Sequence, residues 1–354
     1  MMQANQTAFS NLIEQFGDRS DEIVPPGIRY IRTSVEEKIW LKELVFGERL
    51  DITPSLRMQM IKYGGKNYVS VIGAVVDSAR VDSDVLEEID QNAGIVTAML
   101  SEKIVNLSRS INILEFYNSI LFQHLDQGYS GHDFHELIQF IDHFATFALP
   151  DDSVLKDEGL SRIACYIFSL NHQLLILNFS DDVLELTSEL SLVGSDSISY
   201  KILVGYLFSN TYKHAFLEIY RLIERLFPIG FLKDFYHSLK TEMSFLRFVA
   251  SIEDDMSWKP REDDALEKIF GLCSPETKRH FDNFLATSEL LRERNINKFF
   301  YSLRNSIVHF RANHEEYSLS REQWNLLLLA TLYLLDEQYS LHNRVLQQAH
   351  IPSD

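Results

Sequence analysis

The chain has only two cysteines, Cys165 and Cys273, and this scarcity excludes two kinds of scaffold. Two thiols cannot build a disulfide framework, and they cannot supply the four ligands of a cysteine zinc site. A low cysteine count is typical of proteins that are located in a reducing compartment. We therefore expect a cytoplasmic protein that folds without covalent cross-links.

Glycine and proline are also scarce, with 14 and 8 residues in a chain of 354. This scarcity argues against collagen-like or long disordered segments. Hydrophobic residues make up 45% of the chain, enough to bury a large core. Few turn-forming residues and many Leu, Ile, Glu and Phe favour helix over a turn-rich β architecture. The composition predicts a mainly α protein.

No long apolar run is present. The longest, Leu326 to Leu335, covers ten residues, about half of what a bilayer crossing needs. The N-terminus lacks a basic start followed by an apolar core, so we expect no signal peptide and no membrane partner.

Basic residues are outnumbered, with 33 Lys and Arg against 51 Asp and Glu and a net charge of −18. An acidic surface repels phosphate, so the chain as a whole is not built to coat nucleic acid. An enzyme that acts on nucleic acid needs only a local basic site, and such a site remains possible.

The N-terminal half has a mixed pattern. Residues 1–27 are predicted to be loosely ordered. Residues 68–76 are rich in β-branched residues and are predicted to form a strand after a turn at Gly64-Gly65. Helical spacing marks 83–125 and 130–147, while 165–180 fits a buried strand or a buried helix. We place a domain boundary between residues 195 and 196, after an N-terminal region of α or α+β structure with a sensing or regulatory role.

The C-terminal half, 196–354, is predicted to be a bundle of helices. The ranges predicted to be helical are one around 215–226 and those at 231–251, 262–272, 275–288, 293–312 and 319–345. Ser320 and Gln323 have the spacing of a capping box at the start of the last of these helices.

A cluster of chemically active residues, Arg304, Asn305 and His309, lies in the predicted helix 293–312. Asn305 and His309 are four residues apart and share a helix face, and the long side chain of Arg304 can bend toward it. Arginine binds phosphate oxygens, histidine transfers protons near neutral pH, and asparagine can orient either group. With RNA as substrate, the 2′-hydroxyl supplies the nucleophile. These residues therefore suit metal-independent cleavage of RNA.

The charge around this cluster is opposite to that of the whole chain. Between residues 290 and 314 there are five cations and one anion, Glu293. This local excess of positive charge indicates a basic site in an acidic protein. The alternative without catalysis is that Arg, Asn and His on a helix are solvated or form hydrogen bonds with buried polar groups.

The order Arg-Asn, three residues, His within Leu-Arg-Asn-Ser-Ile-Val-His-Phe resembles the motif of the HEPN superfamily. These helical domains occur in prokaryotic toxins, abortive-infection proteins and other antiviral systems. The run from His214 to Phe227 resembles the first long helix of large HEPN domains. The resemblance covers roughly residues 200–350, and residues 1–195 match no family that we can name.

The resemblance implies a homodimeric endoribonuclease that needs no cofactor and no metal. Arg304 and His309 would be catalytic and Asn305 would orient them. Glu218, on the earlier helix, is a supporting candidate that also suits a solvated face. Arg311 is a further supporting cation. Some HEPN toxins have a Tyr at that position, where a partner nucleotidyltransferase modifies them, so this mode of control is not expected here. An antitoxin or another defence protein is a possible partner.

Two alternatives stay open. A catalytically silent HEPN-like bundle could serve as a dimerisation or adaptor module in a defence complex. A metal-dependent hydrolase could instead use His124, His132, His135 and His143, although their spacing forms no known ligand set. No phosphate-binding glycine loop or nucleophile elbow is present.

Overall fold

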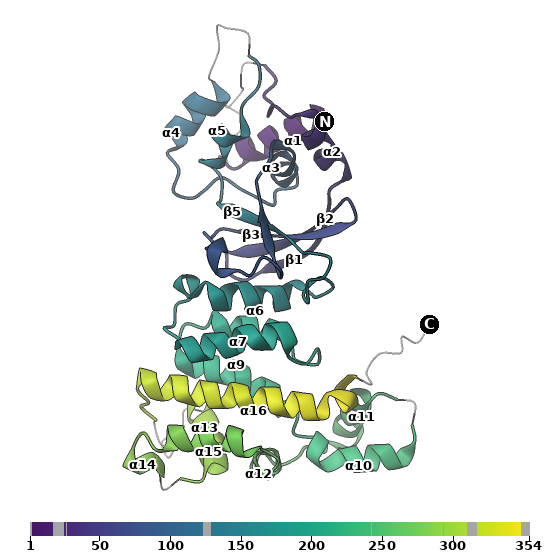
Figure 1. Cartoon of the computed structure of the whole chain (residues 1–354), viewed down its shortest axis with the longest axis vertical. Helices are drawn as coiled ribbons and strands as arrows, with labels where there is room; N and C mark the ends of the chain where they lie inside the picture. Colours follow the sequence, from purple (N-terminus) through teal and green to yellow (C-terminus); the bar gives the residue numbers. More distant parts are fainter. Residues whose placement is uncertain are drawn as a thin grey trace. The chain divides into compact units, whose positions relative to one another are not determined.

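The computed structural model describes residues 2–16, 25, 27–122, 129–241, 243–292, 294–309 and 317–347. The chain forms two compact units, Met1–Leu160 and Ser161–Asp354 (Figure 1). The predicted boundary at 195/196 therefore moves to 160/161. The helices between these positions belong to the second unit, because the helix that starts at Asp181 packs on the last helix of the chain.

A five-stranded antiparallel sheet is the centre of the first unit. In space its strands follow the order β1-β2-β3-β5-β4. Their bounds are β1 Val45–Asp51, β2 Arg57–Tyr63, β3 Lys66–Ile72, β4 Glu87–Ile89 and β5 Phe144–Ala148. β5 lies between β3 and β4, so it pairs with two strands that are far from it in sequence.

The predicted turn and strand are confirmed in the β2–β3 hairpin. Tyr63 pairs with Lys66, and Gly64 and Gly65 between them have φ of +58° and +76°. Two successive residues with positive φ are what a tight hairpin turn requires, and glycine adopts them without strain. β3 ends at Ile72, before the predicted end at residue 76.

Short helices pack beside this sheet. They are α1 Met2–Glu14, α2 Val35–Glu43, α3 Ala93–Ser101, α4 Ile113–Phe116 and α5 Phe134–Ile138, with a 3-10 turn at Ser78–Arg80 and a π-helical turn at Tyr117–Leu121. A second 3-10 turn, His172–Leu174, belongs to the second unit. Leu12 of α1 and Val96 of α3 are fully buried in one cluster with Ile61, Ile72 and Phe144 of the strands. The helices thus cover one face of the sheet.

Three predictions for this unit are wrong. Residues 2–14, within the range expected to be loosely ordered, form α1, and Asn11 anchors it by donating to the carbonyl oxygen of Leu100 at 2.9 Å. The range 83–125, predicted to be helical, contains the strand β4, and the helix α3 within it ends at Ser101. The predicted helix 130–147 gives way to β5. Pairing with distant strands determines both β4 and β5, and local periodicity cannot detect it.

The second unit is helical, as predicted. Its helices are α6 Leu160–Leu170, α7 Asp181–Val193, α8 Tyr200–Leu207, α9 Tyr212–Glu224, α10 Ile229–Leu239, α11 Phe245–Met256, α12 Glu262–Gly271, α13 Pro275–Leu285, α14 Glu289–Arg292, α15 Ile296–Val308 and α16 Arg321–Gln347. The ambiguous segment at 165–180 is helical up to Leu170. The predicted helix 231–251 is divided at Lys240, which has the left-handed φ of +48°.

The last helix, α16, packs against α7, α9, α11 and α13 (Figure 1). Its predicted capping box is confirmed: Gln323 N donates to Ser320 Oγ at 3.2 Å, and Ser320 N donates to Gln323 Oε1 at 2.9 Å. Within the part of the chain that the structure describes, no helix, α16 included, is long and apolar enough to cross a membrane.

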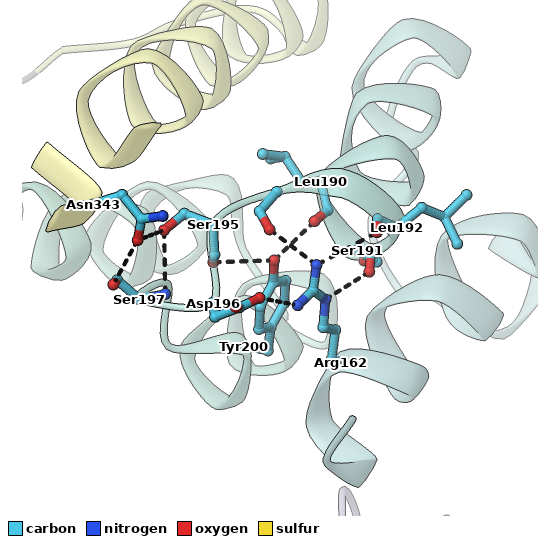
Figure 2. A network of polar contacts seen from close by, with 10 residues as sticks. Arg162, Leu190, Ser191, Leu192, Ser195, Asp196, Ser197, Tyr200 and Asn343 are labelled. Carbon is cyan, nitrogen blue, oxygen red and sulfur yellow. Dashed lines mark hydrogen bonds and ion pairs between the residues drawn. The ribbon is translucent and has the colours of Figure 1, made fainter. Parts of the chain in front are cut away.

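A buried arginine on α6 holds the end of α7. Arg162 Nε donates to the carbonyl oxygen of Ser191 at 2.8 Å, and Nη2 donates to that of Gly194 at 2.9 Å. Nη1 pairs with Asp196 at 2.6 Å, and the guanidinium lies 4.8 Å from the Tyr200 ring centre (Figure 2). The last carbonyls of a helix have no partner within it. Arg162 satisfies them with a charged donor.

We expect Arg162→Met to lower the free energy of unfolding by about 3 kcal/mol, because the buried carbonyl groups of Ser191 and Gly194 lose their donor. Urea denaturation followed by far-UV circular dichroism measures this change. The matched control is Arg221→Met, since the Arg221 side chain is 59% exposed and pairs with Glu218 on the surface. Its cost should stay below about 1 kcal/mol. Equal effects of the two substitutions would contradict a structural role for the Arg162 network.

Candidate active site on α15

The helix that carries the motif is anchored by aromatic packing. Asn295 caps α15 by accepting hydrogen bonds from two backbone N–H groups of its first turn. Phe299, Phe300 and Leu303 are buried, and the Phe300 ring lies 4.9 Å from that of Phe216 on α9. Burial of this face fixes the rotation of α15 and so determines where its partly exposed residues point.

Arg304 is held between helices α9 and α12. Its Nη2 lies 3.3 Å from Glu224 Oε1 and 3.7 Å from Glu262 Oε1. Tyr220 Oη donates to the second carboxylate oxygen of Glu262 at 3.4 Å, and the Tyr220 ring centre is 6.0 Å from the guanidinium. We call Arg304, Glu224, Glu262 and Tyr220 the Arg304 cluster. Its arginine side chain is only 20% exposed.

Two groups of the Arg304 cluster have shifted pKa values. Burial raises the pKa of the Glu224 carboxyl, and the positive charge of Arg304 opposes this shift without cancelling it. Glu262 adds to the increase, since two carboxylates beside one arginine repel each other. The pKa of Tyr220 is also raised, first by burial and then by both carboxylates. Glu224 therefore takes up a proton more readily than an exposed glutamate.

Hydrogen bonds connect Asn305 to both of the other motif residues. Arg304 Nη1 donates to Asn305 Oδ1 at 3.0 Å, so the structure brings these two side chains together. The backbone N–H of His309 donates to the carbonyl oxygen of Asn305 at 2.9 Å. His309 itself is the C-cap, with φ −116° and ψ 113°, so the chain leaves the helix there rather than at residue 312 as predicted. The histidine is exposed to solvent.

The two supporting candidates have different outcomes. Glu218 pairs with Arg221 on its own helix at 2.8 Å and is not among the ion-pair partners found for Arg304. Its role stays a prediction. Arg311 lies outside the described residues. Of the other cations predicted to make this region basic, Arg294 donates to the Tyr317 hydroxyl at 2.9 Å.

Sequence reasoning missed both acidic partners of Arg304. Glu224 had a detectable signal, because it lies four residues after Tyr220 on the same face of α9. Glu262 had none, because it comes from the first turn of a different helix.

The histidines considered as metal ligands have separate partners. His132 Nδ1 lies 3.0 Å from Glu136, His135 Nδ1 lies 2.8 Å from Asp133, and His143 Nδ1 lies 3.0 Å from a carbonyl oxygen. His124 is outside the described residues. Among the residues that are described, no three His, Cys, Asp or Glu side chains are grouped so that they could hold a metal ion.

Comparison with known proteins yields no relative. No family model matches the chain, and no curated protein and no solved structure matches it. The interpretation of the site therefore rests on its residues and their geometry.

We expect Glu224→Gln to change how stability depends on pH. A carboxyl whose pKa is higher in the folded than in the unfolded protein favours folding at low pH, and this contribution is lost as the pH rises through the folded pKa. The folded pKa of Glu224 is raised above 4.5, so the stability of the wild type relative to Glu224→Gln should fall as the pH rises from below 4.5 to neutrality.

Urea denaturation of both proteins across this pH range measures the difference, which isolates Glu224 from the other carboxyl groups. Glu218→Gln is the matched control on the same helix. A difference that grows in favour of the wild type as the pH rises would mean that pairing with Arg304 outweighs burial.

Proposed function

We propose that the protein is a metal-independent endoribonuclease of HEPN type, with Arg304 and His309 as catalytic residues. The observation that carries the proposal is the arrangement at the end of α15. Arg304 is oriented by Asn305, and one turn later an exposed His309 is bonded through its backbone to the same Asn305. Cleavage of a phosphodiester without metal requires a cation and a group that transfers protons, and Arg304 and the exposed His309 supply these two groups from the last turns of the same helix.

In the proposed reaction, His309 removes the proton from the 2′-hydroxyl of a ribose. The 2′-oxygen attacks the adjacent phosphorus, and the bond to the 5′-oxygen of the next nucleotide breaks as that oxygen takes up a proton from water. His309 then releases its proton to solvent. The products are a 2′,3′-cyclic phosphate and a 5′-hydroxyl. Arg304 stabilises the negative charge on the phosphate oxygens during the attack.

The same proposal includes a homodimer in which two α15 helices meet at a composite cleft. Tyr301 and Val308 support it, because both are exposed apolar residues, 36% and 46%, at helical spacing on either side of Asn305. We place this nuclease in a toxin or antiphage defence system, with an antitoxin or defence protein as partner. Two buried free cysteines fit a cytoplasmic location.

One observation favours the alternative of a catalytically silent adaptor. Arg304 is largely buried and has two carboxylates within 3.7 Å, so its charge is already balanced inside the protein. In an adaptor the Arg304 cluster would connect three helices and do no chemistry.

The test is incubation of total cellular RNA with the purified protein in EDTA. We expect the wild type to cleave RNA, leaving 2′,3′-cyclic phosphate ends. His309→Ala should reduce the rate by about 10²-fold or more, because a general acid or base contributes on this scale. It should leave the melting temperature almost unchanged, because the histidine is exposed.

The matched control is His237→Ala, which removes an exposed histidine of α10 and should retain the wild-type rate. Absence of cleavage by a wild-type protein that is folded and dimeric would reject the nuclease and support the adaptor. Cleavage that His309→Ala does not reduce would show that His309 is not catalytic.

A further inference from the structure

A cavity of about 430 Å³ lies in the N-terminal unit, next to α1 and α2. Its volume is within the range of pockets that hold small organic molecules. The described residues of its wall are three with large apolar side chains, Ile28, Tyr30 and Ile31, and four polar ones, Asn5, Arg32, Thr33 and Lys38. None of these is a carboxylate.

The wall formed by residues 30–32 is fixed by hydrogen bonds from distant parts of the unit. His132 N donates to the carbonyl oxygen of Tyr30 at 2.9 Å, and Arg32 N donates to that of His132 at 2.8 Å. The hydroxyl of Tyr129 bonds to the backbone of Tyr30 at 3.0 Å. The cavity is therefore built before any ligand arrives, which reduces the entropy lost on binding.

Asn5 points to a polar ligand. It is 4% exposed, and its Oδ1 accepts a hydrogen bond from Ile31 N at 2.8 Å. This bond leaves the Nδ2 hydrogens as the remaining donors of the amide. No hydrogen bond from Asn5 Nδ2 to a described residue is found. Asn5 Nδ2 is therefore a donor that a ligand in the cavity can reach.

Among the described residues that line the cavity, the charged side chains have one sign. Lys38, half-buried on α2, has no ion-pair partner among the described residues. Arg32 is 52% exposed, and its ion-pair partner among the described residues is Asp133 at 3.8 Å, which is also bonded to His135 at 2.8 Å. A pair this long and this exposed contributes little. Two cations and one amide donor thus meet at the cavity in a chain with a net charge of −18.

We propose that this cavity binds a small organic anion with an apolar body. The apolar side chains would cover the body of the ligand, while Arg32, Lys38 and the Asn5 amide would bind its anionic group. This site is separate from the Arg304 cluster, and the proposal does not depend on ribonuclease activity.

The probe for the test is 1-anilinonaphthalene-8-sulfonate, an aromatic anion whose fluorescence increases in apolar surroundings. Titration of the full-length protein should show one saturable site. Arg32→Gln with Lys38→Gln should weaken binding at least tenfold, because each charged hydrogen bond is worth about that factor. The neutral analogue N-phenyl-1-naphthylamine should bind the wild type more weakly than the anion does.

The matched control is Arg49→Gln with Lys62→Gln, which changes the net charge equally within the same unit but away from the cavity. It should bind the probe like the wild type. If both double variants weakened binding equally, the effect would come from the overall charge of the protein, and the proposed site would be wrong. Equal affinity for the neutral analogue would overturn the anionic character of the ligand. Lys38→Gln alone serves as a milder variant if the double variant does not fold.

Discussion

The second unit depends on one constraint, that α16 must be covered on several sides. Leucines fill its middle, and Leu327, Leu328, Leu332 and Leu335 are completely buried. A helix that is apolar around most of its circumference is stable only inside a shell of other helices. Helices α7, α9, α11 and α13 form that shell. The Arg162 network contributes to it by holding the end of α7.

The proposed site follows from this arrangement. Tyr339 of α16 donates to the carbonyl oxygen of Leu222 at 3.0 Å and so helps to place α9. From α9, Tyr220 packs on Phe300 of α15 with ring centres 5.6 Å apart. The next turn of α15 then carries Arg304 toward Glu224. The ion pairs are thus a consequence of aromatic packing rather than its cause.

The sequence predicted the helices after residue 212 well because the information was local, whereas α7, which lies just before the predicted boundary at 195/196, was not predicted. Each helix there has its own apolar periodicity, and caps such as Ser320 mark where helices begin. The first unit was predicted poorly from residue 83 onward, because β4 and β5 form only when they pair with each other and with β3. The same limit applies to the site. The motif is contiguous and could be found, whereas Glu262 reaches Arg304 only through tertiary packing.

Net charge is a poor guide to where this protein could bind anions. The region predicted to be basic contains Arg304, whose charge is balanced by Glu224 and Glu262. The cavity beside α2 was not recognised from sequence, yet its described wall has two cations and no carboxylate. Coulomb interactions over a few ångströms at low dielectric exceed the screened field of distant surface charges. A phosphate at Arg304 therefore has to compete with two nearby glutamates, whereas an anion in the cavity meets no such competitor among the described residues that line it.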